Sequence, residues 1–116
     1  MNWKKNFVQG KELVLSSSSV SGKPHSIIVI SNGFFDNKLL VSDCQMKKTL
    51  VNLKNNPHIA IVNKYVLLEG SVKLFSSGKY FDACLKKSGG YTIKNAILIT
   101  IKKVTNLDNQ QVLFTK

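Results

Sequence analysis

The stretch SDCQMKKTLVNLKNNP, residues 42–57, predicts a short helix that follows directly on an apolar strand. Ser42 and Asp43 come after the apolar segment 38–41, and their side chains can accept hydrogen bonds from the free N–H groups of a helix start. Three apolar residues then recur at the spacing of one helical face, namely Met46, Leu50 and Leu53. Pro57 ends the pattern, because the residue before a proline is driven out of the helical conformation. The stretch therefore predicts a strand–turn–helix unit whose helix has about three turns.

Two lysines and a hydroxyl, those of Lys47, Lys48 and Thr49, lie in the first turn of this expected helix. A helix N-terminus already directs free N–H groups and the positive end of its dipole at solvent, so cations gain nothing there by themselves. Their presence is explained if a phosphate binds among them. The alternative is an ordinary helix with a solvated lysine face, and these residues alone leave both interpretations open.

Length and composition predict a single globular domain, residues 1–116, in which 43% of the residues are apolar. No apolar segment is long enough to cross a membrane, and the first residues lack the continuous apolar core of a signal peptide. Cys44 and Cys84 are isolated from each other and from the histidines. Two such cysteines are typical of reduced thiols, so we expect a cytoplasmic protein.

The charge of the chain is strongly positive, because seventeen basic residues stand against six acidic ones, a formal net charge of +11. All seventeen basic residues are lysines, whereas bidentate recognition of phosphates and base edges is mostly arginine chemistry. Lysines can still bind polyanions through counterion release with little sequence preference. A lysine-biased proteome would give the same composition. The charge therefore favours an anionic ligand without identifying it.

Strand-like segments dominate the rest of the chain and are separated by turn signals. They are residues 12–17, 25–31, 39–41, 58–62, 65–75 and 96–104. Segment 25–31, HSIIVIS, is almost wholly apolar, which suits a strand covered on both faces. A second short helix is expected over residues 78–87. Within the expected strand 65–75, Gly70 marks a bulge or a close approach by another group. Six strands in neighbouring antiparallel pairs with few helices predict a mainly β protein, a small closed barrel.

Two segments resemble the pyridoxamine 5′-phosphate oxidase-like FMN-binding split-barrel family. The first is the Gly-Lys-Pro-His turn, residues 22–25, before an apolar strand. The second, more specific one is Lys-Thr-x-x-Asn-Leu-x-x-Asn-Pro, residues 48–57. The likeness runs from about Leu13 to Leu107. It implies a six-stranded antiparallel split barrel that forms homodimers and holds FMN in clefts between subunits, as in an oxidoreductase that acts on an unidentified small substrate.

The resemblance also implies which residues bind the cofactor. Lys48 and Thr49 would contact the FMN phosphate, with Ser42 and Lys47 nearby. The strand from Ser26 to Val29 would pass the flavin ring and offer backbone groups to its polar edge, through Ser26, Ile27, Ile28 and Val29. The authentic pyridoxamine phosphate oxidase binds its substrate with arginines, and this chain has none. The absence of arginine argues against that substrate, because within a fold the site decides the reaction.

Other functions remain open at this stage. His25 and His58 each begin a strand without a companion carboxylate motif, so we predict no metal site. His25 is a candidate for the ring side of the flavin only by its position in the hairpin, and exposure at a strand end is the simpler account. The alternative to a flavoprotein is a non-enzymatic basic barrel that binds nucleic acid or another polyanion through its lysines. We expect no specific nucleic acid and no membrane as partners.

Overall fold

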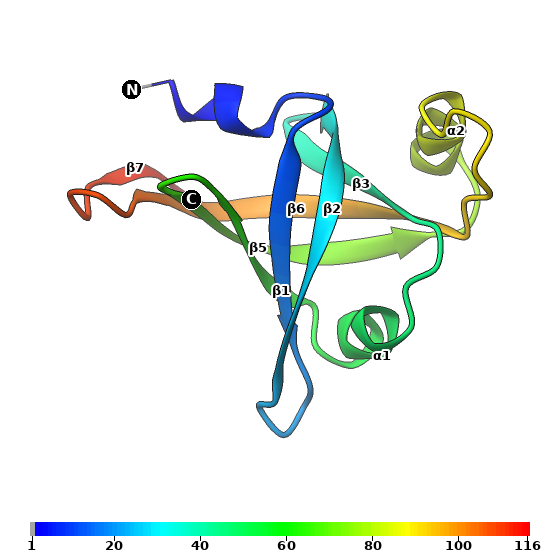
Figure 1. Ribbon diagram of the computed structural model, residues 1–116, viewed down its shortest axis with the longest axis horizontal. Coiled ribbons are helices and arrows are strands. Elements are labelled where there is room, and N and C mark those ends of the chain that lie inside the picture. The colour runs from blue at the N-terminus through cyan, green and yellow to red at the C-terminus, as the bar shows by residue number, and fades with distance from the viewer. Residues whose placement is uncertain (1) are drawn as a thin grey trace.

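The computed structural model describes residues 2–116 as a single chain built mostly of strands (Figure 1). In chain order the elements are η1 (Trp3–Phe7), β1 (Glu12–Ser18), β2 (Pro24–Phe35), β3 (Lys38–Asp43), α1 (Lys48–Asn55), β4 (His58–Asn63), β5 (Val66–Phe75), α2 (Lys79–Lys86), β6 (Asn95–Asn106) and β7 (Val112–Thr115). Within the part of the chain described, no helix has the length and hydropathy needed to span a bilayer.

Six of the strands close into an antiparallel barrel in the order β3-β2-β1-β4-β5-β6. The ring closes because β3 also pairs with β6, from Leu39 opposite Ile99 to Asp43 opposite Asn95. β7 adds to β6 outside this ring. The predicted six-stranded antiparallel split barrel is confirmed. Closure leaves few free sheet edges, which apolar strands would otherwise expose to aggregation.

The barrel interior is filled by alternate residues of each strand, those whose side chains face inward. Its largest fully buried side chains include Phe7, Leu13, Leu15, Leu39, Ile61, Leu68, Ile97 and Ile99. The helix η1 covers one end of the barrel, where the ring of Trp3 packs edge-on against that of Phe34 at a centroid distance of 6.3 Å. A smaller apolar cluster lies under α2 and includes Cys84, Leu40 and Leu98.

The expected start of the first helix is wrong. Ser42 and Asp43 belong to β3, and α1 begins only at Lys48, without a side-chain cap. The reason is that both oxygens of the Asp43 carboxylate accept hydrogen bonds from groups outside α1. Its Oδ1 accepts a hydrogen bond from the Met46 backbone N–H at 2.9 Å, while its Oδ2 accepts one from the Asn95 side chain on β6 at 2.8 Å. Asp43 therefore anchors the loop between β3 and α1, and does not cap the helix.

β2 is longer than the sequence predicts and is not covered on both faces. The expected turn at Asn32 and Gly33 is a bulge inside the strand, and the chain reverses at Asp36 and Asn37, both with positive φ. The outward side chain of Ile28 is 63% exposed. The apolar character of this strand is therefore not explained by the interior of a single chain.

Candidate functional site

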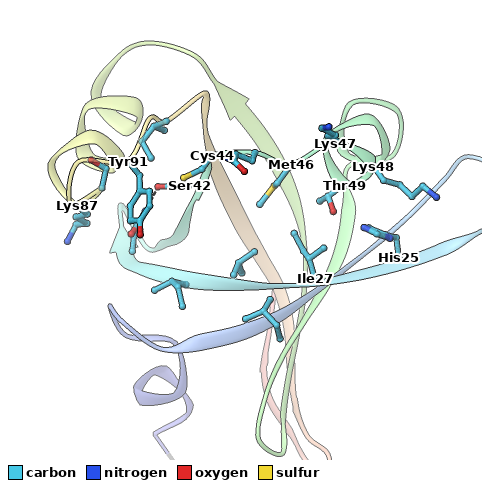
Figure 2. Close-up of a pocket in the computed structure, with 17 residues that line it drawn as sticks. His25, Ile27, Ser42, Cys44, Met46, Lys47, Lys48, Thr49, Lys87 and Tyr91 are labelled. Atoms are coloured by element: carbon cyan, nitrogen blue, oxygen red, sulfur yellow. Dashed lines mark hydrogen bonds between the residues drawn. The ribbon is translucent and has the colours of Figure 1, made fainter.

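A cavity of about 780 Å³ lies beside β2, between the start of α1 and the segment that connects α2 to β6 (Figure 2). Its volume is within the range of small-molecule sites, roughly 300–1,000 Å³. Seven of the eight predicted cofactor residues line it: Ile27, Ile28, Val29, Ser42, Lys47, Lys48 and Thr49. The eighth, Ser26, is not among the lining residues, and its hydroxyl oxygen lies 2.8 Å from that of Ser16 on β1. The structure thus brings two distant segments of the sequence to one site.

The wall formed by β2 is an open strand edge. Along residues 24–30, β2 pairs with β1, whereas its pairing with β3 begins only at Ser31. The Ser31 N–H donates to the Lys11 carbonyl on the β1 side. In an antiparallel ladder the direction of the backbone groups alternates along the strand. The N–H and C=O groups of Ser26, Ile28 and Ile30 therefore point away from β1, toward the open edge.

One end of the cavity is cationic and is formed by the first turn of α1. Lys47 and Lys48 are exposed, and Thr49 is buried, with 2% of its surface accessible. Thr49 lines the cavity, and its hydroxyl makes no hydrogen bond to any other residue of the described range 2–116. The helix is held against the barrel by Asn52, whose side-chain N–H donates to the Ser17 hydroxyl at 3.1 Å. A fixed helix N-terminus with a lysine and a free hydroxyl is a site for an anion.

His25 belongs to the same end. It lies opposite Ser17 on β1 and is drawn beside Lys48 and Thr49 in Figure 2. The hairpin position had suggested the ring side of a flavin. The structure places His25 at the α1 end of the cavity, beside the residues predicted to bind the phosphate.

The opposite end of the cavity is formed by Ser42, Cys44 and the connection after α2. Asn32 on β2 donates a hydrogen bond to the Ser42 hydroxyl at 2.7 Å and a longer one to the Cys84 sulfur at 3.6 Å. Burial, reinforced by the neighbouring Asp43 carboxylate, raises the pKa of the Cys44 thiol. Cys44 is therefore a protonated thiol at neutral pH, which makes it a poor nucleophile.

Sequence reasoning missed two residues at this end, Lys87 and Tyr91. Both line the cavity, and Figure 2 draws them together on the side away from Lys48. They follow α2 in a segment whose only sequence signal is the helix stop formed by Ser88, Gly89 and Gly90. Nothing in that signal indicates a ligand site, because Lys87 and Tyr91 come close to β2 only when the barrel has formed.

Comparisons with known proteins give a fold and no sequence family. No protein-family model matches the chain, and no curated protein matches it by sequence. Solved structures do match. HupZ from Group A Streptococcus has a TM-score of 0.81 at 16% identity, covering 98% of this chain and 98% of that chain. An FMN-binding protein from Syntrophomonas wolfei subsp. wolfei has a TM-score of 0.73 at 14% identity, covering 97% and 81%.

A third similar structure is a pyridoxamine 5′-phosphate oxidase-related, FMN-binding protein from Nostoc punctiforme PCC 73102. Its TM-score is 0.59 at 12% identity, with 90% of this chain and 75% of that chain covered. Identities this low establish the fold alone. The chain has the split-barrel fold found in FMN-binding proteins related to pyridoxamine 5′-phosphate oxidase, as the two sequence segments had indicated.

Proposed function

We propose that the protein is an FMN-binding flavoprotein whose cofactor phosphate binds at the first turn of α1. The observation that carries the proposal is Thr49, a largely buried residue whose hydroxyl has no hydrogen-bond partner among the described residues and is open to the cavity. A phosphate oxygen bound in the cavity would accept a hydrogen bond from this hydroxyl. Lys48, the first residue of α1, would supply the charge, with Lys47 beside it.

The flavin ring would then extend along the open edge of β2. Of the four residues predicted from Ser26 to Val29, the alternation of the strand selects Ser26 and Ile28, because only their backbone groups point away from β1. The side chains of Ile27 and Val29 would provide apolar contacts from the barrel side. Ser42 would lie toward the ring, since it is hydrogen-bonded to Asn32 at the far end of the cavity.

A second copy of the chain would complete the site. On the outer face, Ile28 lies opposite Val14 on β1, Val14 opposite Val62 on β4, and Val62 opposite Leu67 on β5. This outer apolar row includes Ile28 at 63% and Val14 at 36% exposure. Exposed apolar rows that cross several strands mark interaction surfaces. Because Ile28 also lines the cavity, a partner on this row would cover the open side of the flavin.

The activity we propose is that of an oxidoreductase acting on a small substrate in the cytoplasm. FMN supplies the electron chemistry when it is bound, and the protein provides binding, orientation and exclusion of water. No carboxylate lines the cavity among the residues that the structure describes, and the Cys44 thiol is protonated. His25, at the α1 end, is the lining side chain that could act as a general base. Both unpaired thiols agree with a reducing compartment.

The test is a titration of flavin-free protein with FMN, followed by the absorbance change of the flavin. We expect one FMN per chain, with a dissociation constant of about 10 µM or lower, which corresponds to roughly 7 kcal/mol. Sedimentation of the same samples measures the mass of the assembly. Absence of binding up to about 1 mM FMN, or roughly 4 kcal/mol, would refute the proposed function.

A further inference from the structure

The two ends of the cavity are far apart. β2 forms the wall between them, with His25 at the α1 end and Asn32 beside Ser42. These eight residues of extended strand, seven steps of about 3.3 Å, span roughly 23 Å. A ligand group bound at the first turn of α1 therefore leaves the far end to other chemistry.

The far end has a cation that no carboxylate neutralises. The Lys87 ammonium donates a hydrogen bond to the neutral side chain of Gln9 and lies 5.4 Å from the centroid of the Phe35 ring. Among residues 2–116, the one ion pair joins Lys79 to Asp36 and does not involve Lys87. Lys87 also lines a neighbouring hollow with Asp36 and Asp82, but Asp36 is paired with Lys79. On the opposite wall, Asp43 is fully buried and hydrogen-bonded to Met46 and Asn95. Among the described residues, Lys87 therefore has no carboxylate within ion-pair distance, and a carboxylate ligand would have to compete only with its neutral contacts to Gln9 and Phe35.

The same end has an exposed aromatic ring. Tyr91 is 75% exposed, lines the cavity, and has no ring contact or side-chain hydrogen bond with other described residues. Ile93, 6% exposed, lines the cavity two residues further on. An aromatic face beside an apolar side chain and a cation is suited to a flat ring that carries a negative charge, since such faces favour stacking.

We propose that Lys87 and Tyr91 form a second subsite, which binds a small aromatic carboxylate as the substrate or a second ligand. Lys87 bonds to the carboxylate and Tyr91 stacks on the ring. The assignment of this ligand as a substrate rests on the proposed flavoprotein function. It adds a substrate class to that function, because FMN carries its phosphate charge at the other end of the cavity and leaves Lys87 unneutralised.

The experiment uses benzoate and benzamide, two planar probes of nearly the same shape that differ in charge. Each is titrated into ¹⁵N-labelled protein, both with and without bound FMN, and the amide signals of Ser88, Tyr91 and Ile93 are followed. We expect benzoate to shift these signals and to bind about threefold to tenfold more tightly than benzamide, as for a partly exposed charged hydrogen bond. Tyr91→Ala should weaken both probes.

Charge-matched variants separate the subsite from the general positive charge. Lys87→Met should remove the preference for benzoate, whereas Lys86→Met, one residue earlier and outside this cavity, should change either affinity by less than twofold. Equal binding of the two probes, equal effects of the two variants, or no shift at Tyr91 would overturn the inference. If FMN binds and benzoate does not, the subsite is rejected and the flavoprotein function is kept. Binding of benzoate at Tyr91 without FMN would keep the subsite and reject the flavoprotein function.

Discussion

Replacing Lys48 by alanine should weaken FMN binding and leave riboflavin binding almost unchanged. Lys48 is the exposed first residue of α1, at the positive end of the helix dipole and next to Thr49 in the sequence. An FMN phosphate would accept a charge-assisted hydrogen bond there, whereas riboflavin has no phosphate to bind. The comparison of the two flavins therefore isolates the interaction with the phosphate.

The size of the effect follows from the charge of the donor group. A hydrogen bond between charged groups contributes about 1.5–3 kcal/mol, so Lys48→Ala should raise the dissociation constant of FMN by about one to two decades. Thr49→Val keeps the shape and removes the neutral hydroxyl. It should cost about 0.5–1.5 kcal/mol, or roughly twofold to tenfold in affinity.

Lys54→Ala is the matched control for Lys48→Ala. Lys54 is also exposed on α1 but lies in its last turn, about 9 Å along the helix axis, and does not line the cavity. Its removal should change FMN affinity by less than twofold. Isothermal titration with both flavins at one salt concentration measures all four proteins. The reasoning is refuted if Lys48→Ala leaves FMN affinity unchanged, or if it weakens riboflavin to the same degree.

Four further outcomes are expected. Val14→Glu should place a charge in the outer apolar row and shift the assembly to monomers at micromolar concentration; light scattering that finds no difference from the parent would count against that interface. Gly70→Ala should lower the free energy of unfolding by about 1–3 kcal/mol in a urea titration, because the added Cβ would lie 2.3 Å from the Thr100 carbonyl oxygen; an unchanged midpoint would contradict this contact. Hydrogen bonding from Lys79 lowers the pKa of Asp36 from 3.8, so this pair stabilises the fold above about pH 4 and stops doing so as the pH falls below the lowered pKa. The difference in the free energy of unfolding between the parent and Asp36→Asn should therefore vanish at that low pH. A difference that stays constant with pH would disprove the linkage. Single-stranded DNA should bind weakly and lose affinity steeply with added salt in fluorescence anisotropy; tight, sequence-selective binding at physiological salt would favour the polyanion-binding alternative.

Local sequence determined the elements and the cationic turn of this protein. Apolar residues at helical spacing, ended by Pro57, put Lys48 and Thr49 in the first turn of a helix, where the structure has them. The glycine inside β5 was predicted to mark a bulge or a close approach, and Gly70 is both, since the register with β6 shifts there and the Thr100 carbonyl leaves no room for a Cβ. These features depend on neighbours in the chain, so they can be derived from short stretches.

Partners distant in sequence decided the features that the sequence predicted wrongly or missed. Asp43 is bonded to Asn95, fifty-two residues away, so it is unavailable as a helix cap and α1 starts later. Lys87 and Tyr91 reach the cavity because α2 packs over β3 and β6. A side chain capable of several hydrogen bonds makes the one that the closed barrel brings within reach, and local sequence cannot rank those partners.

The open edge of β2 shows the same division. The family resemblance implied that residues 26–29 pass beside a flavin, but all four have the same backbone groups. Which of them face the cavity depends on the pairing of β2 with β1, where the register of Leu13 opposite Val29 and the bond from Ser31 to Lys11 leave the groups of Ser26 and Ile28 on the free side. The residue types of a segment favour a strand, whereas the register of that strand with a neighbouring strand decides which of its backbone hydrogen-bonding groups remain free for a ligand.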